Sequence, residues 1–283
     1  MSFASTLATA LTLTPGQLLQ RYEPVVVLHP EERFAPVAVD AFLADARLEA
    51  TAAGPRYALP DCTADVGVPS IDCYAAIESV RRPKNVVYGA VRAQRNRIAL
   101  QYWYWYSYNF WSGEHPATDH VWQAHEGDWE TVVVLLTRAG RPLLAGYSQH
   151  SCGKRRAWSR VPRAGRTHPV VHVALGSHAN EFRVGELDMD LRPQCYDPAG
   201  AGILRAALPR VLDRTGDGRR VATRLVRVTS SSPTWMRFPG AWGEANVFHA
   251  GGRNFFSGLG PRGPAFHDVW RDPLGTLARW PVG

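Results

Sequence analysis

Several features that would narrow the function of this 283-residue chain are missing from its sequence. No apolar run approaches the ~18 residues that a membrane-spanning helix needs, so no transmembrane segment is expected. The apolar N-terminal stretch has no Lys or Arg before it and no convincing cleavage site, so a secretory signal is not predicted. We therefore expect a cytoplasmic protein, or a secreted one if the chain is a mature form. Internal repeats are also missing.

Lysine is nearly absent, and this shapes the interpretation of the charge. The formal net charge is +7, yet Lys84 and Lys154 are the only lysines, so arginine carries nearly all of the positive charge. This skew is typical of a GC-rich, bacterial genome. The sequence contains no zinc finger, no RNA-binding aromatic motif and no basic helix, so nucleic acid is not expected as a partner.

Cysteine is scarce, and its spacing excludes one kind of metal site. The four cysteines are Cys62, Cys73, Cys152 and Cys195, and none forms a CxxC pair, which argues against a cysteine-based structural zinc. Cys62 and Cys73 flank a short loop with Pro and Gly and could form a disulfide. An even count permits disulfides without requiring them, so the oxidation state stays open.

The chain is dominated by segments that favour β-structure. From residue 85 onward, runs rich in β-branched and aromatic residues end at Gly, Pro, Asn or Ser. Strands are predicted over 25–28, 86–92, 97–106, 129–137, 143–149, 170–175 and 221–229. No regular alternation with long helices appears, which argues against a parallel α/β sheet. We predict one mostly-β domain over 1–283, built as a two-sheet antiparallel β-sandwich.

Helices are expected only as short decorations of this sandwich. Thr14-Pro15 followed by GQLLQRY is typical of an N-cap and a first helical turn. Further helical segments are predicted over 40–50, 74–80 and 200–214, the last limited by Pro209. The tail over 231–283 is dense in Gly, Pro and Trp, so we expect a long irregular C-terminal segment pinned by aromatic side chains.

Residues 125–130 read HEGDWE and carry the strongest chemical signal in the chain. They lie at the start of a predicted strand, where residues two apart share a face, so Asp128 and Glu130 project together. Gly127 permits a tight turn that brings the His125 imidazole over the two carboxylates. The three side chains are therefore expected to converge on one point.

Two carboxylates and one imidazole suit a hard or borderline divalent cation. Without a cation the two carboxylates would repel, and one would take up a proton. We predict a metal site with His125, Asp128 and Glu130 as ligands and Ca²⁺ or Mg²⁺ as the first choice, with Mn²⁺ and Zn²⁺ left open. The competing interpretation is a strand end with solvated acids and a capping histidine. Asp119, His120 and Glu126 are further ligand candidates near the motif, with Asp119 assigned to the metal and Glu126 to the catalytic or ligand-binding residues.

Two further predicted strands end in polar turns that contain histidine. One turn holds Ser148 and His150, and the other holds Ser177, His178 and Asn180. Strand ends of an antiparallel sandwich can meet at one rim, so we expect these side chains to join HEGDWE in a composite catalytic or ligand-binding site. For each histidine alone, a hydrogen-bonded structural role is the alternative.

Two other chemistries are disfavoured by the local sequence. Neither Ser148 nor Ser177 lies in a G-x-S-x-G elbow, which argues against a serine hydrolase. The stretch from Asp213 to Gly218 resembles a calcium loop but has Arg224 at the twelfth position, where an acid is required. A hairpin turn is the better interpretation of that stretch.

A basic run and an aromatic run flank the predicted site. Lys154, Arg155 and Arg156 directly follow the His150 turn and could bind a phosphate or carboxylate through guanidinium forks. A solvated basic loop is the competing interpretation. The aromatic run YWYWYSY over 102–108 is expected to fill the core, while the polar tips of Tyr106 and Tyr108 could reach a ligand groove.

Several motifs taken together resemble the Vps62-like (vacuolar protein sorting 62-related) family. They are QYWYWYSYN, HEGDWE, YSQHSCG, HPVVHVALGSHAN, FPGAWGE and GPRGPAF, and they follow one another from about residue 25 to residue 270. The family name implies little about mechanism.

A more distant resemblance is to the necrosis- and ethylene-inducing peptide-like (NLP) cytolysins, whose signature ends in His-Asp-Trp-Glu with an earlier His. The stretch AHEGDWE keeps the earlier His, the Asp, the Trp and the Glu, while Gly127 replaces the second His. The resemblance implies an NLP/actinoporin-like β-sandwich with Ca²⁺ or Mg²⁺ at this motif and a sphingolipid sugar headgroup as ligand. By position it implies His125, Asp128, Glu130 and Asp119 as metal ligands and His150 as a residue lining the site.

Two classes of function remain open at this point. In the first, the protein binds a small polar or anionic ligand, such as a glycan, a lipid headgroup or a phosphorylated molecule, with help from the metal. In the second, it is a metal-dependent hydrolase, lyase or cyclase that uses His150 or His178 as general acid or base. A purely structural metal is the third possibility.

Overall fold

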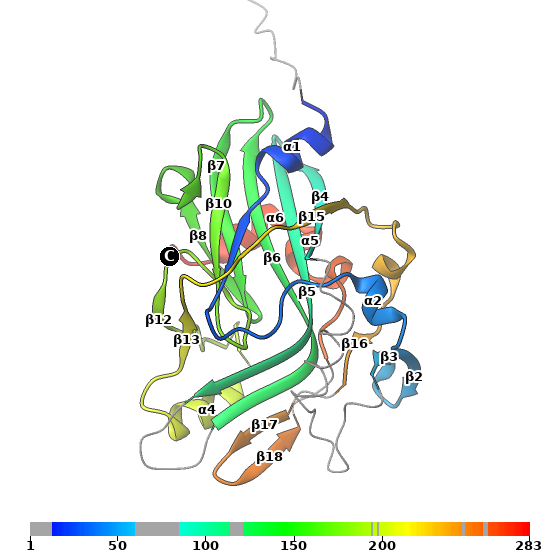
Figure 1. Cartoon of the computed structure of the whole chain (residues 1–283), viewed down its shortest axis with the longest axis vertical. Helices are drawn as coiled ribbons and strands as arrows, with labels where there is room; N and C mark the ends of the chain where they lie inside the picture. Colours follow the sequence, from blue (N-terminus) through cyan, green and yellow to red (C-terminus); the bar gives the residue numbers. More distant parts are fainter. Residues whose placement is uncertain are drawn as a thin grey trace, which may run out of the picture.

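The structure is a computed structural model that describes residues 13–59, 85–113, 121–193, 195–196, 198–244, 247–256 and 260–283. It confirms the mostly-β prediction: two larger sheets and two small ones carry most of the ordered chain, and the helices are short (Figure 1). The fold is best understood from its two longest strands, because these position the candidate site.

The largest sheet is built around two 17-residue strands, β5 (Arg97–Gly113) and β6 (Val121–Thr137). They pair antiparallel along their whole length, from Arg97 opposite Thr137 to Gly113 opposite Val121. The other strands of this eight-stranded sheet are β4 (Val86–Gln94), β7 (Pro142–Gln149), β8 (Cys152–Ala157), β15 (Arg224–Arg227), β17 (Val247–Ala250) and β18 (Arg253–Phe256).

The second large sheet packs its apolar side chains into the same core. Its strands are β1 (Val25–Leu28), β9 (Arg163–Ala164), β10 (His168–Val173), β11 (Asn180–Glu181) and β14 (Arg220–Val221). Valines of β1 and β10 join the aromatic residues of β5 in one buried cluster. β1 pairs with β10 in parallel, and β15 pairs with β4 in parallel. Each large sheet therefore contains a parallel pair in addition to the antiparallel pairs that were predicted.

Two small sheets complete the fold. One pairs β12 (Gly185–Asp188) with β13 (Leu212–Thr215), and the other joins β2 (Arg47–Thr51), β3 (Gly54–Ala58) and β16 (Ala241–Trp242). The predicted helix over 40–50 is therefore only partly right: α2 spans Val39–Leu43, a turn follows over 44–46, and β2 begins at Arg47. Residues from Arg47 onward pair with β3 and do not continue the helix, although their apolar spacing suits one. An ion pair between Glu49 and Arg56 connects β2 and β3.

The remaining helices match the expectation of short decorations. The helix α1 (Pro15–Arg21) begins at a capping box, in which Thr14 accepts from the Gln17 N–H and the Gln17 side chain accepts in return. The others are α4 (Pro198–Ala207), α5 (Asp268–Arg271), α6 (Pro273–Arg279) and the 3₁₀ turns η1 (Trp158–Arg160), η2 (Thr234–Arg237) and η3 (Pro264–Phe266). The helix predicted over 74–80 lies outside the described residues.

A kink at Gly127 changes which side chains of β5 and β6 face the second sheet. The Tyr106 ring stacks on His178, and the Asn109 side chain bonds to the Asp128 carboxylate on the same side of the strand pair. On a regular strand, two side chains that are three residues apart would face opposite ways. Gly127 has a φ of +70°, and a Cβ there would lie 2.3 Å from the Trp105 ring. The kink therefore requires glycine for both its backbone conformation and its space.

The same region of β6 has an outer edge that no described strand covers. β17 pairs with β6 from Trp122 to Ala124, and β7 pairs with it from Val132 onward. Between these two partners, among the residues the structure describes, β6 is bonded to a neighbouring strand only along its β5 side. This interval contains all of HEGDWE, so the candidate site lies at a gap in the sheet.

Beyond the kink, the far ends of β5 and β6 carry a second, smaller core. It gathers Trp111, Val121 and Phe248 against Leu204 of α4 and its neighbours, separately from the main cluster. We call the segment from β12 to β13, including α4, the α4 lobe. A disulfide between Cys152 and Cys195 ties this lobe to the turn between β7 and β8.

Candidate functional site

The polar strand ends predicted from the sequence meet beside the gap in β6. The Ser148 hydroxyl donates to the Glu130 carboxylate, and the Asn180 side-chain amide lies 3.4 Å from the same carboxylate oxygen. The Ser148 oxygen also accepts the Thr131 backbone N–H at 2.6 Å. The ends of β7 and β11 are thereby joined to the unpaired edge of β6.

A second group of contacts surrounds His178. Its Nδ1 lies 3.0 Å from Asp128 Oδ2, and its Nε2 lies 3.6 Å from Glu32 Oε1. The imidazole stacks on the Tyr106 ring with a centroid distance of 3.9 Å and an interplanar angle of 3°. Burial alone would lower the pKa of this imidazole, but the two carboxylates more than offset it and raise the pKa to about 9. His178 is thus a buried cation between two carboxylates.

A third group contains His150 and an acid that the motifs did not reveal. His150 Nε2 lies 3.0 Å from Asp213 Oδ2, and the Ser177 hydroxyl donates to Asp213 Oδ1 at 2.6 Å. Burial lowers the pKa of His150, the Asp213 carboxylate raises it, and the net shift is upward. His150 and His178 both have a φ of +53°, a conformation that few residues other than glycine adopt. The structure therefore holds both imidazoles on tight turns.

Glu130 differs from the other acids of the site because its described hydrogen-bond partners are all neutral. They are the Ser148 hydroxyl, the Asn180 amide and the His150 backbone N–H. Burial, followed by the nearby Asp128 charge, raises the pKa of Glu130 well above its ordinary value. By contrast, the pKa of Asp128 is lowered: burial raises it, but the hydrogen bond and charge of His178, the His125 charge and the Asn109 hydrogen bond together lower it further.

These groups face a cleft of about 920 Å³ that extends across the gap in the sheet. Its polar wall includes Asn109, Asp128, Ser148, His150 and Ser177. Its aromatic walls include Trp103, Trp111, Trp129, Tyr196, Phe248 and Phe266. Such a mixture of apolar walls with a few convergent polar groups is typical of small-molecule sites.

The fit of a metal ion rests on donor chemistry more than on the observed side-chain positions. Among the described residues, no group of three His, Cys, Asp or Glu side chains is arranged to hold a metal. Asp128 and Glu130 are held by protein donors instead. Even so, the Glu130 carboxylate has no described cationic partner and the buried Asn180 Oδ1 has no hydrogen bond, so the oxygen donors suit a hard cation.

His125 and Glu126, neighbours in the motif, fall on different sides of the sheet. His125 lines the cleft, and its Nδ1 lies 2.7 Å from the Gly127 carbonyl oxygen. Glu126 instead accepts the backbone N–H groups of Leu59 and Glu244, and burial raises its pKa to about 8. The kink at Gly127 thus separates Glu126 from the other polar groups of the site.

The predicted anion-binding run makes contacts within the chain. Lys154 Nζ lies 2.7 Å from Glu181 Oε1, and the Nε groups of Arg155 and Arg156 donate to the Trp280 and Gly283 carbonyls. Most of this run therefore fastens the C-terminal segment and does not extend into the cleft.

The remaining predicted residues fall into two groups. Tyr106 and Tyr108 are almost fully buried, and neither lines the cleft. Their ring faces pack on His178 and Phe34 respectively. Asp119, His120, Cys62 and Cys73 lie outside the described residues.

Sequence reasoning missed three polar residues and one covalent link. Glu32 accepts the Gly176 backbone N–H at 2.6 Å and pairs with His178. Asn109 donates to Asp128, and Asp213 pairs with His150. None lies in a motif that signals its role, because each reaches the site through pairing of distant segments. The link between Cys152 and Cys195 had no distinctive spacing either.

With the geometry established, the chain can be compared with known proteins. No family model matches it. It is 27% identical over 187 residues to the putative vacuolar protein sorting-associated protein TDA6 of Saccharomyces cerevisiae. The aligned region covers 56% of this chain and 40% of that protein. The chain therefore corresponds to less than half the length of this relative.

The chain is also similar to solved structures at low identity. With NLPPya in complex with mannosamine the TM-score is 0.44 and the identity 12%, over 93% of this chain and 91% of that chain. With the Necrosis and Ethylene inducing Protein 2 from the causal agent of cocoa's Witches Broom disease, the TM-score is 0.37 and the identity 14%, over 77% and 75%. These proteins represent the two families that the motifs resemble. None of the described helices is long and apolar enough to cross a membrane.

Proposed function

We propose that the cleft binds a sugar or a similar polyhydroxylated ligand, and that a divalent cation helps to hold it. The observation that carries the proposal is a cleft lined both by carboxylate, hydroxyl and imidazole groups and by aromatic side chains. A sugar has hydroxyl groups around its edge and apolar C–H faces, so both kinds of wall find a partner. Carboxylates and imidazoles supply the hydrogen bonds that hydroxyls require.

The residues of the site would have two roles, contact with the ligand and coordination of the cation. Asp128, His150 and Ser148 line the cleft and would bond to ligand hydroxyls, while Trp129 and Phe248 would pack against the ring. His125, Asp128 and Glu130 would hold the cation, which would supply coordination of the ligand's hydroxyl oxygens when bound. Asp128 would exchange part of its bonding to His178 and Asn109 for the cation, so cation affinity is expected to be modest.

A titration with amino sugars tests this proposal. Glucosamine and mannosamine are suitable probes because the similar protein NLPPya has been solved with each of them. Isothermal titration in Ca²⁺ should show saturable binding that weakens in EDTA. Asp128→Asn should reduce the affinity about tenfold or more, because a hydrogen bond to a charged group contributes roughly 1.5–3 kcal/mol.

The matched control is Asp188→Asn, which removes the same charge from an exposed ion pair with Arg210 away from the cleft. It should leave sugar binding unchanged. Equal losses in both variants, or no saturable binding by the folded wild-type protein, would contradict the proposal. If EDTA lowers only the melting temperature and leaves sugar affinity intact, the cation is structural.

The pairing of His150 with Asp213 favours one alternative, a metal-dependent hydrolase, lyase or cyclase. A carboxylate behind one ring nitrogen orients an imidazole that faces a cleft, as general acid–base catalysis requires. His178 is less suited to this role because its side chain is fully buried and both ring nitrogens face carboxylates. If His150→Gln abolishes turnover of a candidate glycoside while its binding persists, the protein is an enzyme and not only a binding protein.

A further inference from the structure

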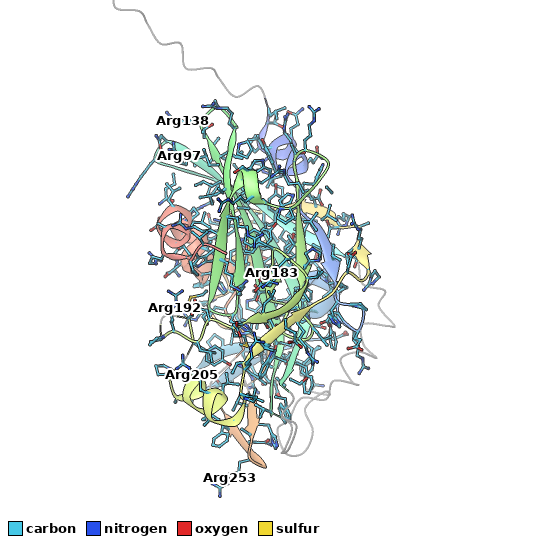
Figure 2. The ribbon with its side chains drawn as sticks, turned by 90° about the vertical axis from the view of Figure 1, so that its left-hand side faces the viewer. Arg97, Arg138, Arg183, Arg192, Arg205 and Arg253 are labelled. Carbon is cyan, nitrogen blue, oxygen red and sulfur yellow. A yellow bond between two sulfur atoms is a disulfide. The ribbon has the colours of Figure 1, made fainter. Side chains whose placement is uncertain are left out.

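The arginines that dominate the charge of this protein gather at one end of the β-sandwich. Three neighbouring segments meet there: the end of α1, the turn between β4 and β5, and the turn between β6 and β7. We call this surface the arginine end, and its members are Arg21, Arg95, Arg97, Arg138 and Arg141. Figure 2 shows Arg97 and Arg138 projecting from this end, with Arg183, Arg205 and Arg253 further along the molecule.

Strand pairing brings these segments together. Arg97 opens β5 directly opposite Thr137, which closes β6 and precedes Arg138. The Tyr22 hydroxyl at the end of α1 donates to the Gly140 carbonyl in the turn between β6 and β7, at 3.0 Å. Residues 20–22, 94–98 and 137–142 contain no Asp or Glu. The grouping is therefore fixed by the fold.

The side chains of the arginine end are available for an external partner. Four of them are exposed and Arg97 is partly exposed, and none forms an ion pair within the described part of the chain. The nearest opposing influence is Asp272, whose pKa is lowered first by a Gln94 hydrogen bond and only lastly by the Arg95 charge. Arg97, Arg138 and Arg141 have no comparable neighbour in the described residues.

We propose that the arginine end docks the protein on a lipid surface that carries anionic phosphate headgroups. Arginine matches phosphate with a rigid fork of N–H donors, and several such groups on separate turn tips can contact one surface together. Leu143 follows Arg141 and leaves 36% of its surface exposed, so an apolar side chain stands beside the cations. A bilayer interface accepts both kinds of group.

The shape of this end favours a membrane over a nucleic acid. The cations of this end stand at turns between strands and at the end of α1, whereas single-stranded nucleic acid is bound in basic grooves with aromatic stacking platforms. The described residues of the three segments offer Tyr22 as their only aromatic side chain, and it is buried. A broad anionic surface is the partner that meets all of the turn tips.

The arginine end and the cleft are separated by the length of β7. Pro142 lies at the arginine end and Gln149 beside the cleft, so eight residues place them about 25 Å apart at roughly 3.3 Å per residue. Docking at the arginine end would hold the cleft above the lipid surface. This inference does not depend on the identity of the cleft ligand, and its failure would leave the sugar proposal untouched.

Vesicle co-sedimentation tests the inference. The wild-type protein should bind vesicles of phosphatidylcholine mixed with phosphatidylglycerol, should not bind phosphatidylcholine alone, and should be released by salt. The triple variant Arg97→Gln, Arg138→Gln, Arg141→Gln should lose about a hundredfold in partitioning, because each basic residue near an anionic surface contributes about one kilocalorie per mole.

The matched control is Arg183→Gln, Arg219→Gln, Arg253→Gln, which removes the same charge from exposed arginines elsewhere. It should keep nearly all of the wild-type partitioning. Equal losses in both triple variants would show that net charge alone is responsible and would overturn the proposal. So would an absence of binding to anionic vesicles, or tighter binding to duplex DNA than to vesicles at equal phosphate concentration.

Discussion

Glu130 is a buried carboxylate whose described hydrogen-bond partners are neutral, and this determines how it responds to a cation. Burial and the Asp128 charge raise its pKa well above its ordinary value, which favours the protonated form when no cation is bound. Glu130→Gln keeps the shape of that protonated acid. In EDTA the substitution should therefore change the free energy of unfolding by less than about 1 kcal/mol.

In saturating Ca²⁺ the two proteins should differ. Cation binding to the wild-type protein would raise its stability by about 2.7 kcal/mol at a hundred times the dissociation constant. Glu130→Gln should show little of this gain, and differential scanning calorimetry measures both conditions. A variant that loses several kilocalories per mole in EDTA would mean that Glu130 is ionised without a cation, which would contradict its raised pKa.

His178 leads to a prediction about alkaline pH. Its folded pKa of about 9 exceeds the ordinary value of 6.5, because Glu32 and Asp128 outweigh the effect of burial. A raised pKa stabilises the fold fully below pH 6.5, and the stabilisation is lost as pH rises through 9. The shift corresponds to roughly 3 kcal/mol.

Chemical denaturation in EDTA between pH 6 and pH 10 checks this expectation. The wild-type free energy of unfolding should fall across the upper part of the range, and His178→Gln should have a flatter profile there. His249→Gln is a suitable control because His249 bonds to Asn254 at a partly exposed position far from the acids. Parallel profiles for the wild-type protein and His178→Gln would show that His178 is neutral in the folded state.

At the scale of the element, β6 depends on one glycine. Gly127→Ala would introduce a Cβ 2.3 Å from the Trp105 ring and 2.5 Å from the Trp242 carbonyl oxygen, at a φ of +70°. Backbone strain of about 1–3 kcal/mol and overpacking of about 1–3 kcal/mol add to each other. We expect a loss of roughly 3 kcal/mol or more, seen by urea denaturation.

Gly165→Ala separates the two effects. Gly165 has a similar φ of +62°, but a Cβ there would meet nothing within 4 Å. Only the backbone cost remains, so the loss should be about 1 kcal/mol. If both variants lose the same amount, the contacts around Gly127 contribute nothing and the kink is held by its backbone alone.

The elements differ in how well the sequence alone predicts them. The cores of β4, β5, β6 and β7 follow from runs of β-branched and aromatic residues, and α1 follows from its capping box. The parallel pairing of β1 with β10 does not, because it joins segments far apart in the chain. The segment over 40–50 shows the limit, since its apolar spacing suits a helix but its last four residues pair as a strand.

The candidate site shows the same division. Polar residues at strand ends near HEGDWE were predictable, because a histidine or serine after an apolar strand is a local pattern. Glu32 and Asp213 were not, because only tertiary contacts bring them to His178 and His150. The acids that raise the pKa of the two histidines were therefore the part of the site that the sequence did not reveal. The metal, the ligand and a cytoplasmic location stay predictions.

At the scale of the whole molecule, the disulfide adds a covalent link between the α4 lobe and the main core. Cys152 lies at the start of β8 beside the cleft, and Cys195 lies in the α4 lobe, 43 residues away. Closing a loop of this length stabilises the folded state by up to about 4 kcal/mol in the chain-entropy account. We expect Cys152→Ser with Cys195→Ser to loosen the α4 lobe more than the main core.

Hydrogen exchange followed by mass spectrometry distinguishes local from global effects. Peptides from 198–215 should lose protection in the double variant, while peptides from 98–106 should keep theirs. Sugar affinity should fall as well, because Tyr196 and the first turn of α4 line the cleft. A uniform loss of protection across both cores would mean that the molecule unfolds as one unit.

The kink at Gly127 has an evolutionary consequence. Strands alternate their faces with a period of two, so a single left-handed residue shifts the alternation for everything beyond it. One pair of strands thereby contributes to two separate buried clusters. Mutation in the α4 lobe can remodel one wall of the cleft while the inherited sandwich keeps its sequence. Ligand specificity could therefore change through substitutions in the α4 lobe while the fold of the β-sandwich stays the same.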